Sequence, residues 1–514
     1  MRGGVLGFVG RRAAEAAVVR RLPRLVVVWV LLVAGAAGSE PGVARAFSPT
    51  LPMRVRLTGR VQSIPGSFWG LSVEVSELLD YVREGAVFDR AISLLRPASG
   101  GPLQFRVGGK SADDAYWNAS TWGAPPWVFA LGDDWLGQLA ALARRDRLRV
   151  TLAVNLAVHS PLMAASFASA ADRALAPAGL AGLAIGNEPD LFAGQPGLEA
   201  ERVADSVPMP VGWTRDYSAS TYRRDYRVYA QALADAVPGV PLAGPETARS
   251  ASEWLDVLTP LGPLRPRWLT VHRYPLSLCW AQASPFFPRI PSLLSERSSA
   301  VLAARLRGAI AFAHNAGVPL RVSEINSVSC GGNAGVADSF ATALWAPDVL
   351  FELMRAKVDG VNWHIRRELI NAPFRLLPGA IEPLPELYGL ALFAQMLGPE
   401  PRRAEASVSA SAGLHVKVWA VTSRNGLSVL LINKGPRAAR ASLCCGTARE
   451  TAHLERLLAP SITARSGVTL GGRSIGPDGR WHGRELTTAI RPSGRRYHIL
   501  LPGYSAALVR AAKL

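Results

Sequence analysis

Eight short apolar runs, separated by longer segments, constrain the fold of this chain more than any other feature of its sequence. The intervening segments carry apolar residues every three or four positions, as amphipathic helices do; the clearest are 77–95, 134–145, 217–237, 293–316 and 337–357. Strands that alternate with helices form parallel sheets with right-handed crossovers, and eight such units close into a barrel. We therefore predict an α/β fold with a (β/α)8 TIM barrel over residues 66–398. The apolar runs are residues 68–74, 103–108, 148–155, 183–188, 241–246, 268–274, 319–324 and 360–364.

The last part of the chain has a different pattern. From about residue 407 the sequence is rich in Val, Leu, Thr, Arg and Gly, and apolar and polar residues alternate in short runs, as they do in half-buried strands. Turn sequences such as Arg424-Asn425-Gly426 separate these runs. Residues 53–64 alternate in the same way. We predict an antiparallel β-sandwich domain formed by residues 399–514 together with residues 53–64.

The positive charge of the chain lies at its two ends. The formal net charge is +18, but residues 47–399 carry 32 Lys and Arg against 31 Asp and Glu. The sequence has no contiguous basic cluster and no basic motif interleaved with aromatic residues, which are common marks of a nucleic-acid interface. We therefore expect no nucleic-acid partner. The scattered arginines of the C-terminal region are interpreted as a solvated face, with binding of an acidic glycan or cell surface as the alternative.

Residues 1–39 have the three parts of a secretory signal. Arginines precede an apolar run at 25–33, and small residues follow at 34–39. The apolar run is short for a membrane span, but the basic segment is long enough for an uncleaved anchor. We expect a signal peptide or N-terminal anchor, and hence a protein that is secreted, or membrane-anchored and facing outside.

The four cysteines are interpreted in the light of this expected export, because an oxidising compartment favours disulfides. Cys279 and Cys330 each follow a predicted strand end, so we expect a disulfide between them across neighbouring loops. Metal binding is disfavoured, since neither Cys-x-x-Cys spacing nor a His pairing is present. Cys444 and Cys445 are adjacent in sequence, and both a strained vicinal bridge and free thiols remain open.

The C-terminal ends of the predicted strands carry polar or aromatic side chains. In TIM barrels the functional residues lie at this end of the strands. A complete ring of hydrogen-bonding and aromatic groups suits a sugar-binding site. In strand order these residues are Glu74, Arg106, Asn155, Asn187 with Glu188, Glu246, His272 with Tyr274, Glu324, and Trp363 with His364.

Glu188 and Glu324 end the fourth and seventh strands, so their carboxyl groups project over the barrel mouth from nearly opposite sides. Glycoside hydrolysis needs two carboxyl groups that flank one bond: one protonates the leaving oxygen, and the other attacks or activates water. We predict a retaining pair about 5 to 5.5 Å apart. The pKa of Glu188 should be the higher one, while hydrogen bonds, one from Tyr274, keep Glu324 ionised. Asn187 suits a hydrogen bond to the sugar 2-hydroxyl.

Five ordered segments carry a resemblance to a known family: residues 105–109 (FRVGG), 185–189 (IGNEP), 272–274 (HRY), 323–324 (SE) with 331–332 (GG), and 383–388 (PLPELY). The pairing of Asn-Glu on strand four with Glu on strand seven resembles the retaining glycosidase clan with (β/α)8 barrels. The details are similar to glycoside hydrolase family 79, the β-glucuronidase and heparanase family. The resemblance covers residues 66–398 and implies that Glu188 is the acid/base and Glu324 the nucleophile. It also implies that Glu74, Asn187 and Tyr274 contact the sugar or orient the nucleophile.

The loop after Glu324 departs from this family. Members often place a Tyr there, followed by glycines, to bind the uronate carboxylate, whereas residues 327–332 read SVSCGG. Backbone N–H groups of Gly331 and Gly332 can still bind a carboxylate as an anion nest. Two alternatives follow: a relative in the clan that acts on neutral sugars, of β-glucosidase or xylosidase type, or a non-catalytic carbohydrate-binding protein of the cell surface.

His272, His364 and Trp363 complete the predicted site. We interpret the two histidines as hydrogen-bonding groups of the site, with His272 as a substrate contact, because the sequence has no His-Glu-x-x-His pattern and no carboxylate set at metal-ligand spacing. Trp363 is expected to stack under a sugar ring, with simple core packing as the alternative. We expect a carbohydrate substrate, with or without a uronic acid, and neither a metal nor an organic cofactor.

Overall fold

The computed structural model of the chain describes residues 50–124, 128–176, 179–193, 217–249, 252–367, 369–444 and 450–512. The predicted signal or anchor segment, residues 1–39, lies outside these ranges. Within them, no helix combines the length and the apolar character that crossing a bilayer requires.

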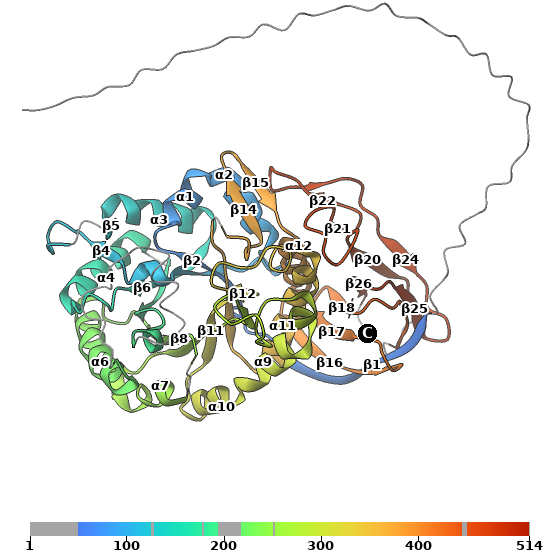
Figure 1. Cartoon of the computed structure of the whole chain (residues 1–514), viewed down its shortest axis with the longest axis horizontal. Coiled ribbons are helices and arrows are strands. Elements are labelled where there is room, and N and C mark those ends of the chain that lie inside the picture. The colour runs from blue at the N-terminus through green and yellow to red at the C-terminus, as the bar shows by residue number, and fades with distance from the viewer. Residues whose placement is uncertain are drawn as a thin grey trace, which may run out of the picture. The chain divides into compact units, whose positions relative to one another are not determined.

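Eight strands close a parallel barrel in the order β11-β13-β2-β3-β6-β7-β8-β9 (Figure 1). Each strand overlaps one of the predicted apolar runs, so the predicted TIM barrel is confirmed. The runs are apolar almost throughout because a barrel strand is covered on both faces, by helices outside and by packed side chains inside. The strands are β2 (Trp69–Glu74), β3 (Leu103–Gly108), β6 (Leu148–Val154), β7 (Leu180–Ile185), β8 (Leu242–Thr247), β9 (Trp268–Arg273), β11 (Leu320–Ile325) and β13 (Gly360–His364).

The helices around the barrel follow the predicted amphipathic segments, with two differences. The segment 77–95 is divided at Glu84 into two helices, and the segment 293–316 is divided into several short elements. In the second case Ser295 and Ser298 both donate hydrogen bonds to the carbonyl oxygen of Ser292, and such local side-chain bonds compete with a continuous helix. The helices are α1 (Leu78–Arg83), α2 (Gly85–Leu94), α3 (Asp133–Arg145), α4 (Pro161–Leu175), α6 (Ala219–Ala236), α7 (Ser252–Asp256), α8 (Ile290–Leu294), α9 (Ala300–Arg305), α10 (Arg307–Asn315), α11 (Phe340–Arg355) and α12 (Pro385–Met396).

Local sequence fixes where several of these helices begin. The Ser160 side chain accepts a hydrogen bond from the Met163 backbone N–H, and Pro161 occupies the first turn of α4. Ser218 caps α6 in the same way through the N–H of Thr221. In the described residues, four short 3-10 helices and eight short strands occupy the loops. These are η1 (Lys110–Ala112), η2 (Pro189–Leu191), η3 (Thr259–Leu264), η4 (Glu296–Ser298), and the pairs β4 (Ala115–Trp117) with β5 (Phe129–Leu131), β10 (Leu276–Ser277) with β12 (Val328–Ser329), β14 (Phe374–Leu377) with β15 (Ala380–Pro383), and β22 (Ser474–Ile475) with β23 (Trp481–His482).

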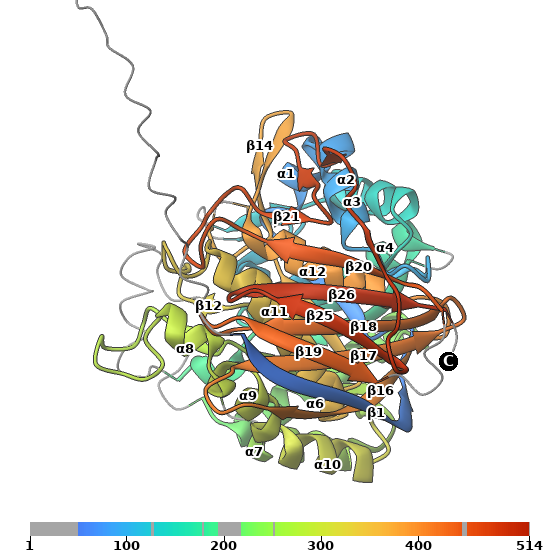
Figure 2. The same ribbon diagram turned by 90° about the vertical axis from the view of Figure 1, so that its right-hand side faces the viewer.

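The C-terminal region forms a β-rich domain, as predicted, but its strands belong to one continuous 10-stranded sheet in the described residues. Strand β1 (Leu51–Ser63) lies between β16 and β19 (Figure 2), antiparallel to β16 and parallel to β19. Strands near opposite ends of the sheet contribute to one core, among them β20 through Leu454 and β25 through Ile499. The other strands are β16 (Arg402–Ala410), β17 (Val416–Ser423), β18 (Gly426–Asn433), β19 (Ala439–Cys444), β20 (Ala452–Leu458), β21 (Thr469–Leu470), β24 (Thr488–Ile490), β25 (Arg496–Leu501) and β26 (Ser505–Ala511).

Strand β18 explains how this sheet is joined to the barrel. Successive side chains of a strand point to opposite faces: Leu430 and Ile432 pack with the barrel core, whereas Val429 and Leu431 pack in the core of the β-domain. Both faces are therefore buried. Helices α11 and α12, which pack on each other, lie next to this sheet in Figure 2.

A buried ion pair crosses the junction between α11 and the sheet. Lys434 Nζ lies 2.8 Å from Asp348 Oδ2, and both side chains are inaccessible to solvent. The second carboxylate oxygen of Asp348 accepts a hydrogen bond from the indole N–H of Trp419 at 3.0 Å. Removing Lys434 leaves Asp348 buried without its cation, and removing Asp348 leaves Lys434 with only the more distant Glu296, at 3.6 Å. Either loss costs far more than removing both charges.

We predict that Asp348→Leu and Lys434→Met each lower the free energy of unfolding by about 3 to 5 kcal/mol. The double variant should lose much less than the sum of the two, because no unpaired charge is left. Urea unfolding of the four proteins measures this coupling. Single variants within about 1 kcal/mol of the wild type, or strictly additive effects, would contradict it.

Candidate active site

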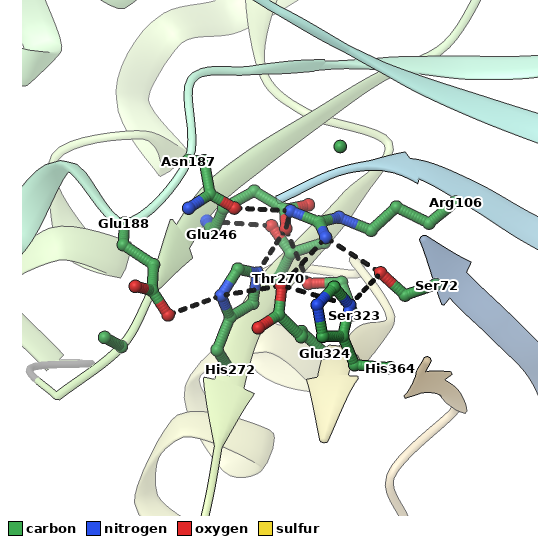
Figure 3. Close-up of polar contacts among 12 residues, drawn as sticks. Ser72, Arg106, Asn187, Glu188, Glu246, Thr270, His272, Ser323, Glu324 and His364 are labelled. Atoms are coloured by element: carbon green, nitrogen blue, oxygen red, sulfur yellow. Dashed lines mark hydrogen bonds and ion pairs between the residues drawn. The ribbon is translucent and has the colours of Figure 1, made fainter. Parts of the chain in front are cut away.

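Arg106 on β3 is the centre of the polar cluster at the C-terminal end of the barrel. Its Nη1 donates to Ser72 Oγ at 2.9 Å and to Glu324 Oε2 at 3.0 Å. Its Nη2 donates to Asn187 Oδ1 at 2.8 Å and lies 3.0 Å from Glu246 Oε2. The side chain is only 1% exposed. Figure 3 shows the guanidinium reaching in from β3 and meeting side chains from four other strands or their ends. This single cation therefore orients side chains from half of the barrel.

Glu324 near the end of β11 is held at both oxygens. Tyr274 donates to Oε1 at 2.8 Å, while Arg106 binds Oε2. His272 and His364 each place a ring nitrogen 3.7 Å from Oε2. Burial acts to raise the pKa of Glu324, but His364, His272 and Arg106 together hold this pKa below its usual value. Glu324 is thus an oriented, ionised carboxylate.

Glu188 follows β7 in a left-handed backbone conformation, with φ 50° and ψ 51°. Its backbone N–H donates to the Glu246 carbonyl oxygen at 3.0 Å, and the residue before it is fixed by the Asn187 N–H bond to Asp113 Oδ2 at 3.1 Å. Burial raises the pKa of the Glu188 carboxyl group, an effect that His272 partly offsets and the charge of Glu324 reinforces. Glu188 therefore tends to hold a proton under conditions in which Glu324 has lost its own.

His272 on β9 connects the two sides of the site. Nδ1 lies 2.8 Å from Glu188 Oε1, and Nε2 lies 2.6 Å from Glu246 Oε2. Burial alone would lower the pKa of His272, but the charge of Glu324 and the bonds to Glu188 and Glu246 raise it to about 9. Both ring nitrogens are then donors, one toward a carboxyl oxygen of Glu188 and one toward Glu246. His272 is an imidazolium bridge at neutral pH.

Glu246 at the end of β8 lies beneath this bridge and is 1% exposed. Ser323 donates to its Oε2 at 2.8 Å. Burial opposes its ionisation, yet Arg106 and His272 lower the pKa of Glu246 to about 2. Its negative charge compensates the two buried cations, Arg106 and His272.

The predicted pair Glu188 and Glu324 is brought together. One carboxylate oxygen of each lies, with a ring nitrogen of His272, in a group whose atoms are all within 4.8 Å of one another. The same three side chains are the candidate metal ligands of the described residues. Arg106 already binds a Glu324 oxygen at 3.0 Å and His272 is charged, so this donor set has the character of an ion-pair network rather than of a cation site.

Asn187 and Tyr274 also belong to this cluster, as predicted, through their bonds to Arg106 and Glu324. Glu74 lies beside it and is 4% exposed. Ser111 donates to Glu74 Oε2 from its backbone N–H at 3.0 Å and from its hydroxyl, and His364 Nε2 is 3.5 Å from Oε1. Burial acts to raise the pKa of Glu74, but His364, Arg366 and Ser111 together hold it well below its usual value. A Cβ on Gly109 would lie 2.3 Å from this carboxylate, so only glycine fits there.

The structure corrects two predicted substrate contacts. Trp363 is fully buried, packs on Trp69 and Trp345, and donates its indole N–H to Glu386 at 3.1 Å. It is a core residue beneath the site, and the prediction that it stacks on a sugar is wrong. His272 is likewise inaccessible to solvent, because it is closed in by its carboxylate partners. It therefore positions Glu188 instead of touching a substrate.

The loop after Glu324 has an unusual backbone. Cys330, Gly331 and Gly332 have φ values of 60°, 88° and 82°. Three successive positive φ values differ from the alternation of right- and left-handed residues that forms an anion nest. Gly331 is partly exposed and Gly332 is buried, where a Cβ would lie 2.9 Å from Ile370. The nest that the sequence suggested is therefore not formed in this conformation.

The predicted disulfide between Cys279 and Cys330 is confirmed, with a Cα–Cα distance of 6.0 Å. The short strands β10 and β12 pair immediately before the two cysteines, with Ser277 opposite Ser329, so the disulfide closes the loops that follow β9 and β11. Cys444 is a free thiol, and Cys445 lies outside the described residues.

Sequence reasoning placed Arg106 and Glu246 among the strand-end residues of the predicted ring but gave neither a role of its own, and it did not single out Asp113. A charged group inside an otherwise apolar run is a signal of a buried ion pair. Asp113 lies in a loop, and nothing in its local sequence indicates that it accepts the backbone N–H groups of Leu156 and Asn187.

Comparison with known proteins shows the fold. No protein-family model and no curated protein sequence matches the chain. A 4-O-α-L-rhamnosyl-β-D-glucuronidase from Fusarium oxysporum 12S superimposes with a TM-score of 0.72 at 18% identity, over 90% of this chain and 99% of that one. A GH51 arabinofuranosidase from Xanthomonas axonopodis pv. citri gives 0.61 at 14% identity, over 90% and 99%. A glycoside hydrolase family 30 subfamily 8 xylanase from Clostridium acetobutylicum gives 0.53 at 16%, over 90% and 100%.

We predict that the imidazole of His272 titrates near pH 9 in the folded protein. Because this pKa lies above the ordinary value of about 6.5, the imidazolium contributes stability that is fully present below about pH 6.5 and is lost as the pH rises through 9. An NMR titration of the imidazole carbons, assigned with His272→Gln, measures the pKa. Glu246→Gln removes one of the carboxylates and should lower it by about one unit or more. An imidazole that titrates at or below pH 6.5 would refute the charged bridge.

Proposed function

We propose that the chain is a retaining glycoside hydrolase of β-glucuronidase type, with Glu324 as nucleophile and Glu188 as acid/base. The observation that carries this proposal is the approach of the two carboxylates, with oxygens within 4.8 Å. Retaining enzymes hold their carboxyl groups about 5 to 5.5 Å apart, whereas inverting enzymes need about 6.5 to 9.5 Å for a water molecule. The opposite pKa shifts of the two groups support the same assignment of roles.

In the first step Glu188 gives its proton to the leaving oxygen while Glu324 attacks the anomeric carbon. Arg106 and Tyr274 fix the two Glu324 oxygens, so that the attacking oxygen is presented in a single orientation. The glycosidic bond breaks, and a covalent ester between the sugar and Glu324 forms. Asn187, fixed by Arg106, is placed to hydrogen-bond the sugar 2-hydroxyl as charge develops on the ring.

In the second step water replaces the carboxylate. Formation of the ester removes the negative charge of Glu324, and this charge contributes to the raised pKa of Glu188. The pKa of Glu188 therefore falls in the intermediate, and the group becomes a base that takes a proton from the attacking water. Cleavage of the ester restores both groups. In this scheme the residues of the chain supply every proton transfer, and we propose that no metal or organic cofactor takes part.

A separate observation supports a preference for glucuronides over neutral glycosides. Among the solved structures with this fold, the rhamnosyl-glucuronidase has a TM-score of 0.72. A second candidate, a clan relative that acts on neutral glucosides or xylosides, is favoured by the loop after Glu324, which has no tyrosine. We further propose that the protein acts outside the cytosol, because a disulfide joins Cys279 and Cys330 and residues 1–39 have the pattern of a signal peptide or anchor.

Glu324→Gln should abolish hydrolysis of aryl glycosides, because the nucleophile is lost. Glu188→Gln should lower kcat about 10²- to 10⁴-fold for substrates with poor leaving groups and much less for the first step with dinitrophenyl glycosides, which need little acid assistance. A panel of aryl glycosides that includes the glucuronide measures both effects. Asp134→Asn, on the exposed first turn of α3, serves as control. Unchanged turnover in Glu324→Gln, or a wild type inactive on every substrate, would disprove the proposal.

The stereochemistry of the product provides a separate test. Two successive inversions at the anomeric carbon give net retention, so a β-glycoside should release the β-anomer first. NMR of the anomeric proton during the first minutes of the reaction distinguishes the two anomers before they interconvert. Release of the α-anomer would show a single displacement, and Glu324 would then act as a general base.

A further inference from the structure

Arg366 is the second residue of the loop after β13, at the C-terminal end of the barrel. Two residues before it, His364 is 3.5 Å from Glu74 and 3.7 Å from Glu324. The intervening residue is fixed at both backbone groups: the Ile365 N–H donates to Ser72, and its carbonyl accepts from Tyr81. The backbone at Arg366 is therefore anchored by the barrel, two residues beyond a histidine that lies beside two carboxylates of the site.

The guanidinium of Arg366 has few partners among the described residues. Among the described residues its one ion pair joins Nε to Glu77 Oε1 at 3.8 Å, and it makes no hydrogen bond. Nε is buried, but the side chain as a whole is 41% exposed. Its neighbour Arg367 differs, because it is bound to Asp80 at 2.8 Å. Arg366 thus offers unoccupied N–H donors to a ligand.

The charge of Arg366 acts on the groups of the site. Burial opposes its charged form, yet Glu74, Glu77, Tyr274 and Glu324 together raise the pKa of Arg366. The other cations of the cluster, Arg106 and His272, are 1% and 0% exposed and are already bound to carboxylates. A negatively charged ligand that enters past Glu74, Glu188 and Glu324 needs a cation that it can reach, and Arg366 provides one.

The barrel places Arg366 on one particular side of a bound sugar. Strand β7, which leads to Asn187, and strand β13, which leads to Arg366, are four strands apart in the ring of eight and so face each other across it. In a pyranose the substituents at C2 and C5 lie on opposite sides of the anomeric carbon. If the 2-hydroxyl meets Asn187, the C5 substituent points toward β13 and the Arg366 guanidinium.

We propose that Arg366 selects the substrate by binding the C5 carboxylate of a uronic acid. This inference rests on the proposed glycosidase function and names the group that recognises its substrate class. An arginine and a carboxylate form two parallel charge-assisted hydrogen bonds, which a neutral hydroxymethyl group does not replace. Arg366 is therefore a specificity-determining residue, distinct from the groups that carry out the bond cleavage.

The test compares 4-nitrophenyl β-glucuronide with 4-nitrophenyl β-glucoside on wild type, Arg366→Gln and Arg366→Lys. Arg366→Gln should lower kcat/KM for the glucuronide about 30- to 100-fold, the loss expected for a charged hydrogen bond. The glucoside should change by less than about threefold, because its hydroxymethyl group needs no cation. For Arg366→Lys, kcat/KM for the glucuronide should lie between the values for wild type and Arg366→Gln, because lysine keeps the charge but loses the paired geometry.

Arg367→Gln is the matched control. It removes the same charge one residue further along, where the side chain binds Asp80, and should leave the glucuronide-to-glucoside ratio unchanged. An unchanged ratio in Arg366→Gln, or equal losses on both substrates, would overturn the role of Arg366. A wild type that cleaves the glucoside but not the glucuronide would overturn it too, while the glycosidase function stands. A wild type that cleaves no glycoside of the panel would overturn both the role of Arg366 and the proposed glycosidase function.

Discussion

The pairing of one buried guanidinium with two carboxylates is the interaction on which the rest of the site depends. Arg106 is 1% exposed and binds Glu324 and Glu246, each at 3.0 Å. A buried charge is tolerated only when it is paired and hydrogen-bonded, so the cation and the acids require one another. Arg106 also orients Asn187 at 2.8 Å. The orientations of Glu324 and of Asn187 are thus set by the same side chain.

The charge of His272 and its surroundings give Glu188 and Glu324 different pKa values. His272 contacts Glu188 on one side and Glu246 on the other, and it stays charged because three carboxylates surround it. Glu324 receives the stabilising influence of both cations, whereas the pKa of Glu188 is dominated by burial. Residues of the same type therefore acquire different protonation states from their surroundings alone.

The sequence indicated the strand ends much better than it indicated the directions of side chains. Apolar runs bounded by polar residues predicted the barrel, Glu188, Glu324 and the Cys279–Cys330 disulfide, because all of these follow from where a strand stops. Trp363 and His272 are each one residue before such an end, and whether a side chain there points into the core or the mouth depends on barrel packing. The role of Arg106 could not be predicted either, because its partners lie on or just after β7, β8 and β11, which are distant from it in sequence.

The candidate site has a sealed lower part and an open upper part. Arg106, Glu246 and His272 are at most 1% exposed, so they act by orienting neighbouring side chains. Glu188 and Arg366, with side chains 23% and 41% exposed, are reached from solvent. Enzymes described as glucuronidase, arabinofuranosidase and xylanase share this fold at 14 to 18% identity, and a fold alone does not fix a substrate. Substrate choice in such a barrel must therefore come from residues of the exposed rim, where single charges differ without disturbing the buried network.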